Sequence, residues 1–375
     1  MIITLSFVNG FKETVSQKVF SFSGHVRVQA RQPMKANIAE DIPIDASGTV
    51  EKAIRSMPQV SDVNPFATKY AILKTTDEME GVLLKGFDSE KAFTHIRQFL
   101  QPGGRMPRFN DSTYSREIVL SAYTAQQLDL KLNDRILIYF VRSDGSMRPD
   151  RLTLVGIYKT SIEEYDKIFA LGDLKLIQRL NGWQPNEIGG YEIFLKDYNQ
   201  MDAVSNAIYE AEAFPQLWET RTVREILPYI FDWLQIQNTN EAILITIMII
   251  IALINLITCL IILVLERLRM IGVLKALGAS NWTVQKIFLY HSAYITLAGI
   301  FLGTLFALAL LWLQMKTGFV RLKEEAYYMQ TAVVKVQWEQ VVAVGVATLV
   351  VSVLVLLIPS FLVRRIQPVK AIRFQ

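Results

Sequence analysis

The sequence of 375 residues contains little of the chemistry from which catalytic sites are built. Its one cysteine, Cys259, lies in an apolar run and can form neither an intrachain disulfide nor a cysteine-based metal site. Its three histidines, His25, His95 and His291, are far apart and belong to no catalytic or metal-binding motif. No glycine-rich phosphate loop ending in Gly-Lys-Ser or Gly-Lys-Thr is present. We therefore expect a protein that is not an enzyme, holds no metal or cofactor, and does not bind ATP through a phosphate loop of its own.

The charge of the chain is nearly balanced, with a formal net charge of +4. No basic patch interleaved with aromatic residues stands out, so the sequence does not indicate nucleic-acid binding. Hydrophobic residues make up 51% of the chain, and most of the excess lies after residue 240. The composition therefore predicts a polar first part and a membrane-embedded second part.

Three apolar segments without charged residues lie in that second part, at 242–265, 293–313 and 341–363. A helix needs about 20 apolar residues to cross the hydrocarbon core of a bilayer. Each segment is long enough, so we predict three transmembrane helices. Gly299 and Gly303 in the second one have the spacing that favours close helix contact.

The N-terminal residues 1–23 begin with a short apolar stretch, Met-Ile-Ile-Thr-Leu-Ser-Phe-Val, that is too short to span a bilayer. It has no basic flank and no small-residue cleavage site, so we do not expect it to be a signal peptide. We interpret it as the second half of a first membrane helix, followed by a connecting amphipathic helix. We expect the natural start of the chain to lie upstream of Met1.

Residues 24–235 have the pattern of a water-soluble α+β domain that is long enough to have its own core. The periodicity predicts strands and helices along this region. We expect strands at 25–29, 67–73, 80–87, 135–142, 151–158 and 191–195, helices at 50–57, 121–130, 165–180 and 198–211, and a turn at 144–145.

The distribution of basic residues gives the orientation. The loop between the first two apolar segments is strongly basic, and so is the C-terminal tail, whereas the loop at 314–340 is nearly balanced. We therefore place the first loop and the C-terminus in the cytoplasm and the loop at 314–340 outside. The domain at 24–235 is then also outside, which requires a membrane helix before it.

The stretch 266–279, Glu-Arg-Leu-Arg-Met-Ile-Gly-Val-Leu-Lys-Ala-Leu-Gly-Ala, lies in this first loop. Leucine and isoleucine recur in it every three residues, while three cations lie off that stripe. An amphipathic basic helix of this kind either lies on lipid headgroups or docks on a partner at the membrane surface.

Several motifs resemble those of the FtsX-like permeases of ABC transporters, the type VII or MacB-like superfamily, and most closely the lipoprotein-releasing branch. The most specific match is the run from Asn255 through Ala279. Other matching stretches are Leu-Ser-Phe-Val-Asn-Gly-Phe at 5–11, Gly-Phe-Asp at 86–88, residues 117–134, Val-Gly-Ile-Tyr-Lys-Thr at 155–160 followed by Glu164 and Asp166, and Pro-Val-Lys-Ala-Ile-Arg at 368–373.

Three positions depart from the pattern of that family. Asn133 stands where glycine is usual, Ser161 follows Thr160 where the family often has glycine, and Met270 replaces an acidic residue. The last departure removes one charge from the stretch 266–279, so its contact with a partner is expected to differ in detail.

The resemblance implies that the stretch 266–279 docks on a separate ATPase subunit. Glycine in a helix costs about 1 kcal/mol, so Gly272 and Gly278 indicate either close approach of a partner or, for Gly278, a helix C-cap. The implied coupling residues are Glu266, Arg267, Gly272, Lys275, Ala276, Leu277 and Gly278.

The resemblance also implies a fold with four membrane helices, the first one truncated, and a MacB-like α+β domain inserted between helices 1 and 2. Residues 236–375 would form the FtsX-like permease domain. The chain would work in a bacterial inner membrane with an ATPase that binds the ATP and a second permease, identical or paralogous. It would pass lipoproteins to a periplasmic carrier, and the loops at 102–112 and 143–149 are candidate carrier contacts.

Other functions share these features. Within the superfamily, the alternatives are an efflux permease for peptides or antibiotics and a regulator that activates an outside hydrolase. Outside it, the alternative is a membrane-anchored signalling or adhesion protein, which would not need the basic stretch 266–279.

Overall fold

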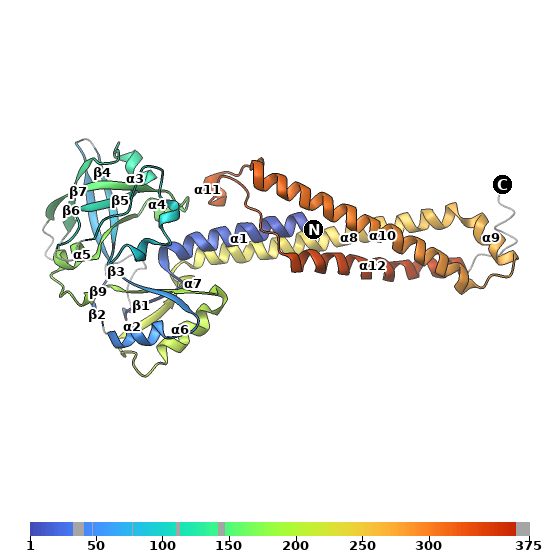
Figure 1. Ribbon diagram of the computed structural model, residues 1–375, viewed down its shortest axis with the longest axis horizontal. Helices are drawn as coiled ribbons and strands as arrows, with labels where there is room; N and C mark the ends of the chain where they lie inside the picture. The colour runs from blue at the N-terminus through green and yellow to red at the C-terminus, as the bar shows by residue number, and fades with distance from the viewer. Residues whose placement is uncertain (33–40, 47, 77, 110–112, 142–146, 365–375) are drawn as a thin grey trace. The chain divides into compact units, whose positions relative to one another are not determined.

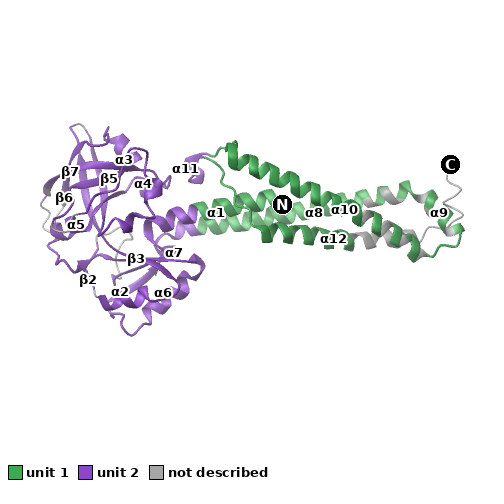
Figure 2. Ribbon diagram, in the orientation of Figure 1, with its two compact units in different colours: residues 1–14, 232–322, 331–375 green, residues 15–231, 323–330 purple. Residues whose placement is uncertain are grey.

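The chain forms two compact units in the computed structural model (Figures 1 and 2). Unit 1 consists of residues 1–14, 232–322 and 331–375, and unit 2 of residues 15–231 and 323–330. The structure describes residues 1–32, 41–46, 48–76, 78–109, 113–141 and 147–364. The predicted turn at 144–145 and the motif at 368–373 lie outside these residues.

Unit 2 is built on a sheet of nine strands in the order β11-β1-β10-β3-β4-β8-β5-β7-β6. Most neighbours are antiparallel, but β4 pairs with β8 and β5 with β7 in parallel. The strands of this sheet are β1 (Val26–Ala30), β3 (Val60–Lys74), β4 (Met79–Phe87), β5 (Glu117–Ser121), β6 (Arg135–Val141), β7 (Met147–Tyr158), β8 (Phe169–Asp173), β10 (Gly190–Leu195) and β11 (Trp218–Thr222). A separate pair joins β2 (Ile44–Asp45) to β9 (Glu187–Ile188).

The long strand β3 belongs to two parts of this sheet. One part of it pairs with β10, and its far end pairs with both β4 and β6. Because β6 also closes onto β3, six strands (β3, β4, β8, β5, β7 and β6) form a closed ring. Closure removes the exposed strand edges that would otherwise invite aggregation.

Helices and short turns flank the sheet of unit 2. Ser121 caps α3 by accepting a hydrogen bond from the backbone N–H of Thr124, and Asp173 caps α5 in the same way. These elements are α2 (Gly48–Arg55), α3 (Ala122–Gln127), α4 (Glu163–Asp166), α5 (Leu174–Asn181), α6 (Met201–Tyr209), α7 (Val223–Ile226), η1 (Lys91–Phe93), η2 (Arg97–Phe99) and η3 (Tyr198–Gln200).

Two tight contacts account for glycines in unit 2. A Cβ atom on Gly86, in the Gly-Phe-Asp motif at 86–88, would lie 2.7 Å from the Cα of Leu174. A Cβ on Gly156 would lie 2.5 Å from the carbonyl oxygen of Arg105. Only glycine allows the backbone to approach so closely at these positions.

The predicted helix at 165–180 is wrong in its first half. The chain instead forms the single turn α4, the strand β8 and then α5. Phe-Ala-Leu-Gly-Asp at 169–173 is a short apolar run, and such runs fit a buried strand as well as a helix. Pairing with β4 decides between them, because β8 lies between β4 and β5 with four of its five residues buried. The predicted helix at 121–130 is also shorter, since Ser121 ends β5 and α3 stops at Gln127.

Unit 1 is helical. Its helices are α1 (Ile2–Ser23), α8 (Pro228–Glu266), α9 (Leu268–Ala276), α10 (Asn281–Thr317) and α12 (Trp338–Arg364). The end of α1 and the start of α8 belong to unit 2. Residues 332–335 lie against α1, where the backbone N–H of Lys335 donates to the carbonyl of Ser6. Gly10 permits this approach, because a Cβ there would lie 2.3 Å from the carbonyl oxygen of Val333.

In the described part of the chain, two helices are long and apolar enough to cross a membrane, Pro228–Cys259 and Ala293–Thr317. They contain the first two predicted segments, 242–265 in large part and 293–313 completely. The part of α12 whose side chains are described, Trp338–Leu354, is apolar but shorter than a span. The third and the truncated first membrane helix therefore remain predictions.

Candidate functional site

The predicted coupling segment forms its own short helix, α9, separated from α8 by a turn at Arg267. The structure divides the seven predicted coupling residues by exposure. Gly272 is buried, and the side chain of Lys275 lies outside the described part of the chain. The other five are exposed: Glu266, Arg267, Ala276, Leu277 and Gly278.

Gly278 ends this segment as a helix C-cap. Its φ angle of +90° lies in the left-handed region that glycine adopts without strain. The backbone N–H of Ala279 donates to the carbonyl of Leu274, which is the long bond of a Schellman motif. No described atom lies within 4 Å of a Cβ placed on Gly278, so the capping conformation accounts for this glycine.

Apolar side chains are exposed on α9 and just after it. Leu277 is 80% exposed and Val273 is 52% exposed, and the segment also carries the exposed residues Arg267 and Arg269. A segment that exposes both apolar side chains and cations is suited to docking into a groove on another protein. No group of three or more His, Cys, Asp or Glu side chains among the described residues could hold a metal ion.

A buried ionic cluster, which sequence reasoning missed, lies in unit 2 where α1 meets the sheet. The ammonium of Lys85 on β4 lies 2.7 and 2.8 Å from the two carboxylate oxygens of Glu192 on β10, and it also donates to the carbonyl of Phe22. Arg27 on β1 donates to the same carboxylate at 2.9 Å. Burial lowers the pKa of Lys85 to about 8, although the nearby Glu192 acts in the opposite direction. The cluster fixes the end of α1 to the sheet.

The signal for this cluster was visible in the sequence. Lys85 interrupts the apolar run Gly-Val-Leu-Leu-Lys-Gly-Phe at 81–87, and a charged residue inside a buried strand needs a partner. What the sequence could not give was the identity of that partner, which lies 107 residues away.

The motif at 155–160 ends β7 and runs into a turn of Lys159, Thr160 and Ser161, here called the Lys-Thr-Ser turn, and its following acidic residues lie on α4. The carboxylate of Asp166 accepts from the backbone N–H groups of Thr160 and Ser161 and from the hydroxyl of Thr160. Burial raises the pKa of the Asp166 carboxyl, and these three hydrogen bonds oppose that shift. These hydrogen bonds hold the turn in one backbone conformation. Beside it, one carboxylate oxygen of Glu164 is buried and has no hydrogen-bond partner among the described residues.

Ser161 has a φ angle of +65° in this turn. Glycine adopts that conformation without strain, which explains why the resembling family often has glycine here. Asn133, the other departure from glycine, has a φ angle of +74° and sits in a similar turn before β6. Asparagine tolerates the left-handed region better than most residues do, so this replacement is mild.

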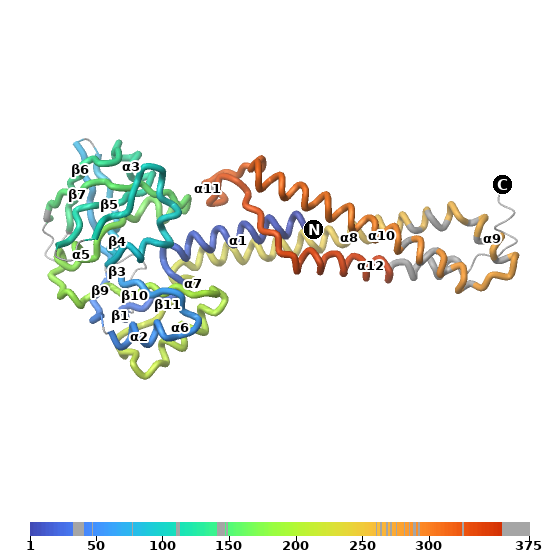
Figure 3. Tube along the Cα trace, viewed as in Figure 1, coloured from blue at the N-terminus to red at the C-terminus, as the bar shows by residue number. Residues whose placement is uncertain are grey.

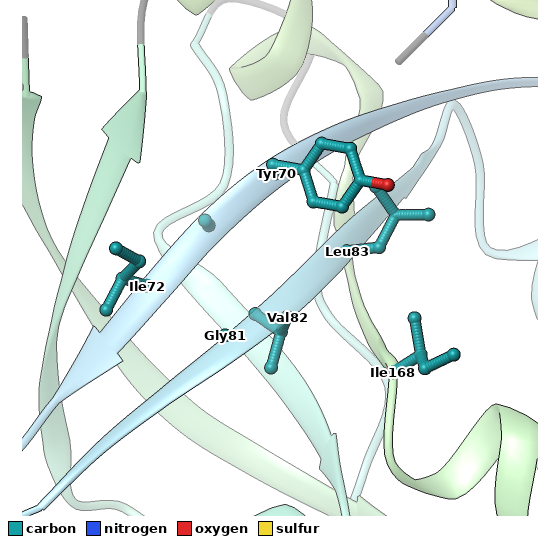
Figure 4. Close-up of a pocket in the computed structure, with 7 residues that line it drawn as sticks. Tyr70, Ile72, Gly81, Val82, Leu83 and Ile168 are labelled. Carbon is teal, nitrogen blue, oxygen red and sulfur yellow. The ribbon is translucent and has the colours of Figure 1, made fainter. Parts of the chain in front are cut away.

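An apolar hollow of about 380 Å³ lies on the pair formed by β3 and β4 (Figure 4). Tyr70 stands over the strands beside Leu83, and Ile168 closes one side. The lining carries no charged group, so the hollow is suited to contact with apolar groups rather than to catalysis. Its residues are Tyr70, Ala71, Ile72, Gly81, Val82, Leu83 and Ile168.

The two candidate carrier loops are only partly described. The loop at 102–112 is held by a bidentate ion pair of Arg105 with Glu117, whose carboxylate also accepts from the backbone N–H of Arg108. Residues 110–112 and 142–146 lie outside the described residues. The described part of the first loop is thus fixed to β5 and carries no distinctive chemistry.

Known families match both parts of the chain. The family described as MacB-like periplasmic core domain matches residues 1–211, which is more than half of the chain. The family described as FtsX-like permease C-terminal matches residues 242–368. The second match contains the stretch 266–279, and the first contains most of unit 2.

Curated relatives align along the full chain. It is 24% identical over 386 residues to the lipoprotein-releasing system transmembrane protein LolE of Haemophilus influenzae, covering 99% of this chain and 90% of the relative. It is 22% identical over 397 residues to the corresponding LolC protein of Neisseria meningitidis serogroup B, covering 100% and 91%.

Among solved structures, the periplasmic region of MacB from Actinobacillus actinomycetemcomitans is 10% identical, with a TM-score of 0.36 over 55% of this chain and 91% of that one. At this level of similarity the overlap adds nothing to the family matches. On those matches, the chain belongs to the family of permeases that carry a MacB-like periplasmic core domain followed by an FtsX-like permease region.

Proposed function

We propose that this chain is a permease subunit of an ABC transporter that extracts lipoproteins from the inner membrane and passes them to a periplasmic carrier. The observation that carries the proposal is the alignment of the whole chain with relatives named as lipoprotein-releasing system transmembrane proteins. A partner ATPase supplies the energy, and a second permease, identical or paralogous, completes the membrane part.

The exposed face of α9 is the proposed contact with the ATPase. It follows α8 directly and joins it to α10, so a push on α9 acts on both helices. ATP binding closes the ATPase subunits, moves α9 and changes the packing of the membrane helices. The movement passes along these helices to unit 2.

The composition of the apolar segments favours a mechanism in which helix movement is transmitted mechanically over one in which solutes pass through a polar channel. Ionisable groups inside a membrane mark the pathways of ions and polar solutes. The three apolar segments contain no Asp, Glu, Lys, Arg or His, and Asn255 and Thr258 are among their most polar groups. Apolar walls suit the acyl chains of a lipoprotein.

Leu277 provides the sharpest test of the coupling surface, because the chain has a matched control. Leu277 after α9 and Leu217 in unit 2 are both leucines and both 80% exposed. We expect Leu277→Glu to abolish ATP-driven lipoprotein release, since a charge in an apolar contact disrupts docking. We expect Leu217→Glu to leave release unchanged.

The measurement is lipoprotein release by the detergent-purified complex after reconstitution into liposomes, with membrane insertion checked for both variants. Equal release by both variants would show that α9 only lies on lipid. Two further results would reject the proposal itself: no ATP-hydrolysing subunit co-purifies with the chain, or depletion of the chain leaves lipoprotein release from the inner membrane unchanged.

A further inference from the structure

The loop between α10 and α12 enters unit 2. The single helical turn α11 (Glu324–Tyr327) and the residues around it, 323–330, belong to unit 2, whereas the chain before and after them belongs to unit 1. Figure 3 follows the backbone from α10 through α11 to α12. Unit 2 therefore holds the segment that directly connects two helices of the permease region.

The start of α11 is held by the Lys-Thr-Ser turn. The Glu324 carboxylate lies 2.8 and 2.9 Å from the ammonium of Lys159, one distance to each oxygen. The hydroxyl of Ser161 donates to the same carboxylate at 2.5 Å. Within the loop itself, the amide of Gln330 donates to Glu324 at 2.9 Å. Hydrogen bonds to a charged acceptor are stronger than neutral ones, so this carboxylate is the main point of attachment.

The end of α11 is held by α1. The ammonium of Lys18 donates to the backbone carbonyl of Tyr328 at 2.6 Å, and Met329 next to it is buried. The loop is thus attached at both ends, through different elements of unit 2. Tyr328 has a φ angle of +55°, so a second residue of this contact, after Ser161, adopts the left-handed region without being glycine.

The partner surface for α11 is formed in advance. Asp166 fixes the backbone of Thr160 and Ser161 through the hydrogen bonds described above. Residues in the left-handed region persist only where surrounding contacts hold them, and they gather at clamps and switches. Serine is more strained than glycine in this backbone conformation, but its hydroxyl donates a hydrogen bond to Glu324 that glycine has no side chain to make. The departure from the family pattern is explained by this contact.

The Glu324 carboxylate stays ionised at the pH values found in a cell envelope. Burial by itself would raise the pKa of Glu324, but the hydrogen bonds from Lys159, Ser161 and Gln330 outweigh it and lower the pKa to about 2.

We propose that α11 is a permanent tie, formed by Glu324 with Lys159 and Ser161 and by the Tyr328 carbonyl with Lys18, through which movement of α10 and α12 is delivered to unit 2. Glu324 and Ser161 are positioning residues in coupled lipoprotein release. The role in release rests on the proposed function, whereas the attachment itself does not.

Amide hydrogen exchange of residues 323–330 tests the attachment without reference to transport. We expect Glu324→Gln and Ser161→Gly in the purified full chain to raise exchange in this segment about tenfold, because charge-assisted hydrogen bonds are lost. Ser161→Gly is informative because it relieves the backbone while removing the hydroxyl. Glu163→Gln is the control, since it removes an exposed carboxylate on α4 whose ion pair is with Lys167. Unchanged exchange in Glu324→Gln would overturn the tie.

Release per ATP hydrolysed tests the role. We expect Glu324→Gln to lower this ratio about fivefold or more while ATP hydrolysis stays within about twofold of wild type, because the tie acts after the ATPase. In a Cys259→Ser background, Ser161→Cys with Glu324→Cys should likewise lose coupled release. A short bis-methanethiosulfonate cross-linker between the two cysteines should restore it, and a reductant should remove it again.

Two results would overturn the proposal: full coupling in Glu324→Gln, or loss of release when the cross-linker is in place. The second would mean that α11 has to detach during the cycle. Failure of the wild-type complex to release lipoprotein would reject the proposed function instead, and the exchange measurement would still decide whether the tie exists.

Discussion

The same kinds of apolar side chain have opposite surroundings in the two units (Figure 2). In unit 2, Phe66, Leu84 and Val119 are fully buried by the chain itself. In unit 1, Phe301 and Phe306 on α10 are 69% and 66% exposed. Apolar surface on this scale is unfavourable in water, so the helices of unit 1 need lipid or another subunit as their surroundings. Unit 2 is stabilised by its own core, whereas unit 1 depends on its environment.

The polar groups differ in the corresponding way. Unit 2 buries the ion pair of Lys85 with Glu192, and an unpaired charge there would be costly. In the helices of unit 1, the backbone N–H and C=O groups instead bond to one another within each helix, as a hydrocarbon environment requires. Three changes test this comparison.

The largest effect is expected at Lys85. We expect Lys85→Met to lower the free energy of unfolding of unit 2 by about 3 to 5 kcal/mol, because Glu192 loses its closest partner in a buried site. Thermal unfolding of the purified chain measures it. Lys74→Met on β3 is the control, since Lys74 is exposed and its loss should cost little. Equal melting temperatures for the two variants would show that the cluster does not hold the sheet and α1 together.

A charge in α10 should have the next largest effect, and on insertion instead of folding. Leu305 is 56% exposed near the middle of the span Ala293–Thr317. We expect Leu305→Asp to make insertion of this helix less favourable by about 3 kcal/mol, because a carboxylate in hydrocarbon is poorly solvated. Leu217→Asp, in unit 2, should change stability by less than about 0.5 kcal/mol. Carbonate extraction of membranes measures insertion, and full insertion of Leu305→Asp would contradict a lipid environment for this face.

The smallest of the three is the pH dependence of unit 2. The ring nitrogen Nδ1 of buried His25 accepts from the backbone N–H of Leu195 at 3.0 Å. Burial, helped by the nearby His95, lowers the pKa of His25 to about 4. The unfolded chain therefore binds a proton that the folded chain rejects, and stability should fall by about 2 to 3 kcal/mol as the pH drops from 6.5 towards 4.

Asparagine at this position isolates the contribution of His25. Its side-chain oxygen can accept the same hydrogen bond without titrating, so His25→Asn should have a flatter dependence of melting temperature on pH. The comparison cancels the effects of other titrating groups, including Asp166 and Asp173. An identical pH dependence in both proteins would assign the acid sensitivity to groups other than His25, Asp166 and Asp173, because the raised pKa values of these two carboxyls favour folding as the pH falls.

Much of the secondary structure could be predicted from the sequence. The strands β1, β4, β6 and β10 lie close to their predicted positions, because alternation of apolar residues is a local signal. The error at 165–180 arose where the local signal was ambiguous and sheet pairing decided the outcome. The stretch 266–279 was predicted as a helix, and α9 forms there, but the burial of Gly272 follows from packing that no local pattern gives.

By itself, the sequence determined where the long apolar helices lie and that an amphipathic basic helix joins two of them. Both follow from short-range properties, namely the length of an apolar run and the period of 3.6 residues. Only the tertiary structure paired Lys85 with Glu192 and Ser161 with Glu324, across 107 and 163 residues. A charged residue within an apolar run indicates in the sequence that its side chain needs a partner, but only the fold determines which residue that partner is.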